Sequence, residues 1–235
     1  MTDILKAVRK QLKATADPNT KESGQRFFKE PVKMYGVKAA AVDRIAKDAL
    51  KSFKNIPKTT IFDLCEQLWH SGIMEESIVA CHWAYSLHKQ FQPEDFAIFE
   101  HWVDEYITNW ATCDTLCNHT IGTFVEKYPK FLRDLQRWAT SENHWKRRAA
   151  AVSLIIPAKK GLFHKDAFAV AKTLLHDTED LVQKGYGWLL KVASQSDQQK
   201  VFEFVMLHKA TMPRTALRYA IEKMPQELKT KLMKK

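Results

Sequence analysis

The sequence predicts an all-α fold of stacked helical pairs, and three observations support this fold class. Glycine and proline number only 7 and 8 among 235 residues, which is too few for the many turns of an all-β fold. Apolar residues recur at helical spacing, and no segment alternates with the period of a strand. Segments around Trp110, Arg148 and Trp188 recur about every 40 residues, which is the repeat length of stacked helical-repeat proteins.

The first part of the chain is predicted as helices joined by an irregular link. The helix over 3–15 is indicated by four apolar residues that share one face, namely Ile4, Leu5, Val8 and Leu12. A loop over 16–19 follows, and the next helix covers 19–29 until Pro31 stops it. Residues 33–38 form an irregular link that turns at Gly36, and a further helix covers 39–53.

The remainder is predicted as a succession of paired helices separated by glycine, proline or polar breaks. Gly72, Pro129 and Pro157 end helices, and Asn143 is a good residue to start one. These helices cover 59–70, 74–91, 93–108, 109–127, 130–140, 144–156, 166–176, 179–194, 198–209 and 213–224.

The formal net charge of +10 favours a polyanionic partner, above all nucleic acid. A lysine-rich surface that only keeps the protein soluble is the alternative for the charge alone. The four cysteines lack zinc-site spacing, so we expect reduced thiols in or near the core and no metal. The N-terminus has no apolar signal-peptide core and no run reaches the roughly 20 apolar residues of a membrane span. We therefore expect a soluble, cytoplasmic protein.

Three short segments contain the candidate functional residues. Trp110 and Asp114 are four residues apart and would share one helix face, where an indole and a carboxylate can stabilise a positive charge. A core tryptophan with an exposed aspartate is the alternative. Arg148 could reach a phosphate with two hydrogen bonds, whereas the adjacent Lys146 is better explained as part of a solvated stripe.

The third segment places Trp188 beside two helical glycines, each of which costs about 1 kcal/mol relative to alanine. Close approach of a ligand to the backbone and tight helix packing explain these glycines equally well. Further along, Arg214 and Arg218 are four residues apart, so they face one way and could grip a backbone phosphate. No P-loop, dinucleotide fingerprint or nucleophile elbow is present in the sequence.

In order and spacing, these elements resemble the AlkD-type DNA alkylation repair glycosylases over nearly the whole chain. The matching motifs are Trp110-x-x-x-Asp114, then Trp138-Ala139-x-Ser141-x-Asn143-x-Trp145-x-x-Arg148-Ala149-Ala150, then Gln183-Lys184-x-x-Gly187-Trp188. The resemblance implies one domain over 1–235, a right-handed solenoid of HEAT-like antiparallel helix pairs with a concave basic face. It also implies a monomer that uses no cofactor, associated with the nucleoid when bound to DNA.

The activity implied by the resemblance is hydrolysis of the N-glycosidic bond of cationic N3- or N7-alkylated purines in duplex DNA. In this interpretation Asp114 stabilises the oxocarbenium-like transition state and positions water. Trp110 and Trp188 pack against the sugar–phosphate of the lesion nucleotide, and Arg148 contacts the adjacent DNA backbone. The DNA-binding residues are Phe27, Lys38, Arg147, Lys184, Arg214 and Arg218.

This chain departs from the family pattern at Phe27, where the archetype has a tyrosine, and at Lys38, where a neutral polar residue is frequent. The ring is kept at position 27 but the hydroxyl is lost. The second hypothesis is therefore a weakly catalytic or non-catalytic repeat protein that binds distorted or branched DNA. A protein-interaction scaffold is the third, and the net charge argues against it.

Overall fold

The structure, a computed structural model, describes residues 2–234 and is helical throughout, with no strand in that range. The predicted all-α class is therefore confirmed. The α-helices are α1 Thr2–Thr15, α2 Pro18–Gln25, α3 Ala39–Leu50, α4 Lys58–Trp69, α5 Met74–Ser86, α6 Asp95–Glu105, α7 Trp110–Thr115, α8 Gly122–Lys127, α9 Leu132–Trp138, α10 His144–Val152, α11 Ile155–Lys159, α12 His164–Thr173, α13 Asp180–Ala193, α14 Gln198–His208, α15 Arg214–Ile221 and α16 Gln226–Met233.

The chain divides into two compact units, Met1–Leu116 and Cys117–Lys235. The boundary falls inside a stretch that was predicted as one helix over 109–127. There α7 is followed by a π-helical segment, Leu116–Ile121, and then by α8. The single domain over 1–235, the handedness of the solenoid and its concave basic face stay predictions.

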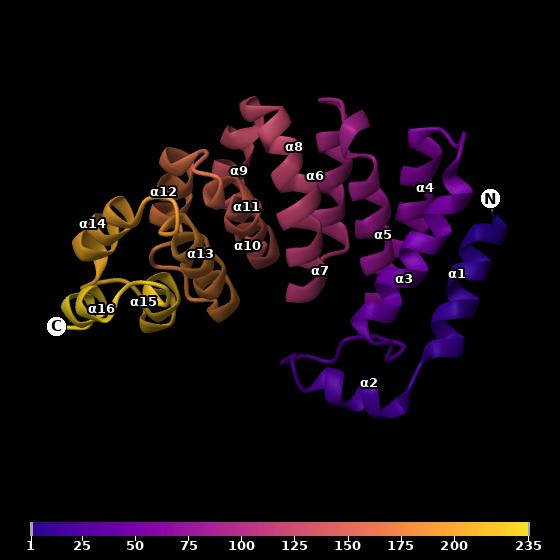
Figure 1. Cartoon of the computed structure of the whole chain (residues 1–235), viewed down its shortest axis with the longest axis horizontal. Coiled ribbons are helices and arrows are strands. Elements are labelled where there is room, and N and C mark those ends of the chain that lie inside the picture. Colours follow the sequence, from indigo (N-terminus) through magenta and orange to yellow (C-terminus); the bar gives the residue numbers. More distant parts are fainter. Residues whose placement is uncertain (1, 235) are drawn as a thin grey trace. The chain divides into compact units, whose positions relative to one another are not determined.

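The first unit is a row of helices around an aromatic core. In this row α1 packs on α3, α3 and α4 pack on α5, and α5 packs on α7, while α2 lies below the lower ends of these helices (Figure 1). The Trp83 indole is fully buried and its Nε1 donates to the carbonyl of Ala46 at 3.1 Å, which ties α5 to α3. Three of the four residues predicted for the α1 face, Leu5, Val8 and Leu12, are buried, whereas Ile4 is partly exposed.

The irregular link predicted over 33–38 is present and is held by two buried glutamates at the start of α5. Gly36 adopts a φ of 91°, and a Cβ there would meet Lys21 and the Asp17 carbonyl. The Glu75 carboxylate accepts from the backbone N–H groups of three successive residues, namely Tyr35, Gly36 and Val37, at 3.0, 2.8 and 3.0 Å. Glu76 accepts from the Tyr35 hydroxyl at 2.6 Å and pairs with Arg9 of α1 at 2.9 Å.

The second unit is organised around α13, which packs against α10, α11, α12 and α15. Tyr186 is fully buried on this helix, and its hydroxyl donates to the Leu175 carbonyl at 3.1 Å. A Cβ at Gly187 would stand 2.7 Å from the Cβ of Tyr219 and 2.9 Å from the Ala216 carbonyl. Gly187 is therefore explained by the close crossing of α13 and α15, which decides between the two readings in favour of packing.

Several helix boundaries differ from the prediction, among them both ends of α2. The helix predicted over 19–29 begins at Pro18, because Asp17 caps it by accepting from the N–H of Thr20 at 2.8 Å. It ends at Gln25, so residues 26–29 are not helical. The helix predicted over 144–156 is divided into α10 and α11, and Pro157 is tolerated because it lies in the first turn of α11. The helix α16, Gln226–Met233, was not predicted.

The four cysteines are free and buried, as predicted. Within residues 2–234 no group of histidine, cysteine and carboxylate side chains could hold a metal ion, and no helix has the length and apolarity to cross a membrane.

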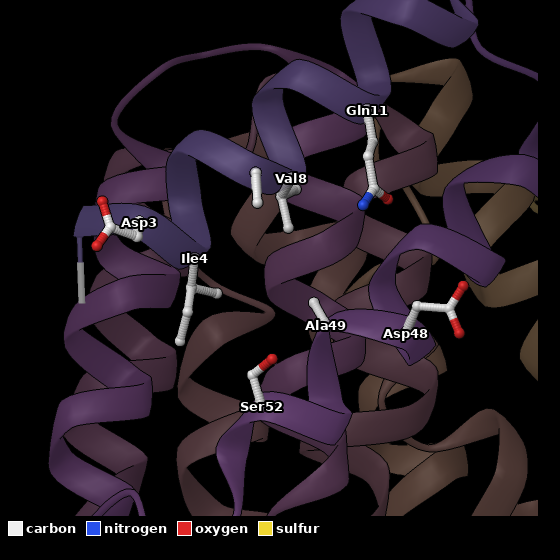
Figure 2. Close-up of a pocket in the computed structure, with 8 residues that line it drawn as sticks. Asp3, Ile4, Val8, Gln11, Asp48, Ala49 and Ser52 are labelled. Atoms are coloured by element: carbon white, nitrogen blue, oxygen red, sulfur yellow. The ribbon is translucent and has the colours of Figure 1, made fainter.

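A pocket of about 300 Å³ lies between α1 and the end of α3 (Figure 2). Asp3, Ile4, Ala7, Val8 and Gln11 line one side, and Asp48, Ala49 and Ser52 line the other. Asp48 is already paired with Lys51 at 2.7 Å, and none of the predicted site residues lines this pocket.

Candidate functional site

The first part of the candidate site is the short helix α7, which presents Trp110 and Asp114 on one face. Asn109 caps it, because its side-chain oxygen accepts from the N–H of Thr112 at 3.0 Å. Thr112 and Cys113 are buried, whereas Trp110 and Asp114 are partly exposed one turn apart. The alternative of a fully buried tryptophan with an exposed aspartate is thus wrong for Trp110.

The Trp110 indole is held in place by the segment that follows α2. The Phe28 ring stacks on it with a centroid distance of 5.3 Å and an interplanar angle of 22°. The indole Nε1 also donates to the carbonyl of Phe27 at 3.2 Å. Phe27 itself points to solvent and is 74% exposed. The structure therefore brings Phe27, Phe28, Trp110 and Asp114 together within the first unit, with Phe28 supplying the ring contact.

Lys38 immediately precedes α3 and is exposed. Its carbonyl accepts from the N–H of Val42 at 3.1 Å, so the backbone there begins the helix. Hydrogen bonds from Thr20 hold the pKa of Asp17 below its ordinary value, and the charge of Lys38 adds a smaller attraction. The predicted contact of Lys38 with DNA stays a prediction.

In the second unit, Asn143 caps α10 as predicted, accepting from the N–H of Trp145 at 2.9 Å. Arg147 forms a two-point ion pair with Asp177, with Nε–Oδ2 and Nη2–Oδ1 distances of 2.6 and 3.2 Å. Its Nη1 also donates to the carbonyls of Ser141 and Glu142. These bonds give Arg147 a structural role in joining α10 to the segment before α13, and its predicted contact with DNA stays a prediction.

Arg148 is 5% exposed and lies against α13. Its Nη1 donates to the carbonyl of Leu181, and a Cβ at Gly185 would stand 3.4 Å from its Cγ. That distance is ordinary van der Waals contact, so the Arg148 side chain packs over Gly185 without requiring a glycine there. Lys146, expected on a solvated stripe, is instead buried with its ammonium 5.6 Å from the centre of the Trp138 ring.

Trp188 is partly exposed on α13, and Lys184 one turn earlier pairs with Asp180 at 2.7 Å. Arg214 and Arg218 are both exposed on α15, whose buried residues are Ala216, Leu217, Ala220 and Ile221. The guanidinium of Arg214 also contacts the sulfur of Met233 at 3.6 Å. The two arginines therefore share one exposed face of α15, as predicted, whereas their binding of a backbone phosphate stays a prediction.

Comparison with known proteins identifies the family to which the chain belongs. A family model described as DNA alkylation repair enzyme matches residues 8–224. The chain belongs to the DNA alkylation repair enzyme family. A solved structure described as a predicted DNA alkylation repair enzyme from Enterococcus faecalis is similar in fold, with a TM-score of 0.80 and 20% identity. That match covers 90% of this chain and 98% of that chain. No curated protein matches the chain significantly.

Phe28 is the residue of this DNA alkylation repair enzyme that sequence reasoning missed. Two adjacent phenylalanines follow α2, and the resemblance selected Phe27. Residues 26–29 lie outside α2, where adjacent side chains point in different directions, and the ring that meets Trp110 is that of Phe28. The predicted helix ended at residue 29 instead of Gln25, so the non-helical position of Phe28 was not expected.

Proposed function

We propose that this member of the DNA alkylation repair enzyme family is a DNA glycosylase for cationic N3- or N7-alkylated purines in duplex DNA. The observation that carries the proposal is a partly exposed carboxylate, Asp114, one helical turn from an indole whose orientation is fixed by Phe28. In a chain with a formal charge of +10, a carboxylate on such a face opposes phosphate binding and is better suited to a cationic reaction centre.

The proposed reaction breaks the bond between C1′ of deoxyribose and the alkylated purine nitrogen. The bonding electrons leave with the base, which neutralises its positive charge, and the sugar acquires oxocarbenium character. Water adds to C1′ and loses a proton to solvent. The Asp114 charge stabilises the developing cation electrostatically, and the face of Trp110 favours the same charge.

The second unit contributes further contacts with the same DNA in this proposal. Trp188 packs on sugar–phosphate. Arg148 contacts the adjacent backbone after its guanidinium, which is bonded to the Leu181 carbonyl in this structure and leaves the residue only 5% exposed, turns outward. Lys184, Arg214 and Arg218 add favourable charge along the strand. The enzyme acts as a monomer in the cytoplasm without a cofactor.

The second candidate function is binding of distorted or branched DNA with little or no catalysis. The observation that favours it is Phe27, whose ring is solvent-exposed and has no hydroxyl to take part in the reaction. Both candidates predict DNA binding, so only the chemistry separates them.

The test is release of methylated purines from duplex DNA treated with a methylating agent. We expect the native protein to free 7-methylguanine or 3-methyladenine, detected by chromatography of the ethanol-soluble fraction, under conditions where unmethylated DNA releases nothing. A protein that binds the methylated duplex but frees no base would eliminate the glycosylase and leave the binding function.

Replacing Phe28 with alanine should lower kcat for base release about 10-fold, since an aromatic pair contributes about 0.5–1.5 kcal/mol beyond its buried area. The indole of Trp110 would lose its stacking partner and sample other orientations. Phe28→Tyr keeps the ring and should stay within about 2-fold of native, because the stack survives. Single-turnover kinetics and DNA affinity measured on both variants give the check. If the tyrosine variant fell as far as the alanine variant, the ring stack would not be what positions Trp110.

A further inference from the structure

A row of aromatic rings joins α12 to α14 in the second unit. The Phe168 ring of α12 stacks on the Phe204 ring of α14 with a centroid distance of 5.2 Å and an interplanar angle of 25°. The row continues at both ends, where His164 meets Phe168 at 6.3 Å and His208 meets Phe204 at 4.7 Å between ring centres. All four rings are partly exposed, so the row lies at the surface, along two neighbouring helices (Figure 1).

Leu207 extends this row into solvent. It is 76% exposed, the largest exposed fraction among the large apolar side chains of residues 2–234. Leu207 is three residues after Phe204, so the two side chains are neighbours on one face of α14. An exposed leucine beside stacked phenylalanines forms a contiguous apolar surface, and such a surface marks a site of interaction with another molecule.

The α12 part of this face is positively charged. Lys165 lies three residues before Phe168 and Lys172 lies four residues after it, so both share the Phe168 face of the helix. Both lysines are exposed, and neither has an ion-pair partner within residues 2–234. Their two charges are therefore available to a partner.

The carboxylates near this face are engaged. Asp197 is paired with Lys200 at 2.7 Å. Glu203 of α14 accepts from a side-chain amide one turn earlier at 2.7 Å, and Asp166 of α12 accepts from an amide of α9 at 3.0 Å. With Lys165 and Lys172 unpaired, the face favours a partner that carries negative charge.

We propose that the face formed by α12 and α14 binds an acidic amphipathic helix of a partner protein. The apolar side of that helix covers Phe168, Phe204 and Leu207, and its carboxylates meet Lys165 and Lys172. An extended segment would need a sheet edge, and residues 2–234 contain no strand. Phosphates have no apolar surface to cover Leu207, and a second copy of this chain would bring a repelling charge of +10. This docking needs no part of the proposed glycosylase chemistry.

The experiment uses three fluorescein-labelled peptides of about 18 residues, a length that supports a helix. All repeat leucine at the spacing of one helix face, and their other positions alternate alanine with glutamate, glutamine or lysine. Anisotropy gives the affinities. We expect the native protein to bind the glutamate peptide about 5-fold more tightly than the glutamine peptide, the effect of two exposed ion pairs. The lysine peptide should bind most weakly.

Leu207→Ala should lower affinity for the glutamate peptide about 10-fold, because truncation of an apolar anchor has an effect of that order. Leu207 packs little within its own chain, so thermal unfolding should match that of the native protein. Tyr85→Ala removes an exposed ring from the first unit and should bind the glutamate peptide as native.

The double variant Lys165→Glu/Lys172→Glu should reverse the preference, so that the lysine peptide binds more tightly than the glutamate peptide. Lys6→Glu/Lys13→Glu is the matched control, because these two lysines are exposed on α1 with the same seven-residue spacing. This control makes the same change in net charge and should keep the native preference.

Three results overturn the proposal. In the first, the native protein does not distinguish the glutamate peptide from the glutamine peptide. In the second, the α1 double variant changes the preference as much as the α12 double variant, which would assign the effect to net charge. In the third, sedimentation shows a dimer that Leu207→Ala abolishes, which would assign the face to a second copy of this chain.

Discussion

Asp114→Asn should lower the rate of base release about 10²–10³-fold, which is the usual effect of removing one preorganised electrostatic group at a reacting centre. Asparagine keeps the volume and hydrogen-bonding capacity of the side chain but removes its negative charge. In the proposed mechanism that charge is the main stabilisation of the developing cation on the sugar, and the face of Trp110 adds a smaller one. Affinity for unmodified DNA should stay equal or rise, because a carboxylate near phosphates opposes binding. Rates are measured in single-turnover assays with methylated duplex.

Asp63→Asn is the matched control for Asp114→Asn. Asp63 is an exposed aspartate on α4 of the same unit, so its replacement makes the same change in net charge away from α7. We expect native rates from this variant and unchanged thermal unfolding from both. Native activity in Asp114→Asn would remove Asp114 from the mechanism, and equal losses in the two variants would point to net charge instead.

The helices were predictable from the sequence because their causes are local. Leu5, Val8 and Leu12 share the buried face of α1 because they repeat with the period of a helix. Asn143 caps α10 through a hydrogen bond to Trp145, only two residues along the chain. Trp110 and Asp114 share a face because a four-residue separation is about one helical turn. Each of these inferences needs only a few neighbouring residues.

The parts of the site that could not be predicted depend on residues far apart in the chain. Arg147 belongs to a basic run, but its ion-pair partner Asp177 is 30 residues away, and no local pattern identifies such a pair. Phe28 meets Trp110 across more than 80 residues, and this contact also depends on where α2 ends. The reason for a glycine at position 187 also depends on a distant helix. Its contact with α15 shows that close helix packing, not ligand approach, explains Gly187.

Glu75 was not singled out by sequence reasoning either, because a glutamate beside a second glutamate at the start of a helix is typical of an exposed helix end. It is instead 2% exposed, and its carboxylate holds the N–H groups of Tyr35, Gly36 and Val37. The link that it holds also accepts the N–H of Asp17 through the Gly36 carbonyl at 3.0 Å. Glu75 therefore fixes the two ends of the α2 region that contains Phe27 and Phe28.

Glu75→Ala should lower the free energy of unfolding of the first unit by about 3–5 kcal/mol, because each buried donor left without a partner costs about 1–3 kcal/mol. Glu75→Gln should lower the free energy of unfolding by less than Glu75→Ala does. Its amide oxygen can still accept from some of the three N–H groups, whereas its NH₂ group faces the remaining donors and accepts none of them. The measurement is urea unfolding followed by far-UV circular dichroism, with the midpoint and slope compared between variants.

Glu94→Ala provides the control for Glu75→Ala, because Glu94 precedes α6, is exposed and makes no capping hydrogen bond. Its unfolding midpoint should match that of the native protein. A fall of less than about 1 kcal/mol in Glu75→Ala would mean that water replaces the carboxylate at the three N–H groups, and the link would then be held mainly by Glu76 and Tyr35.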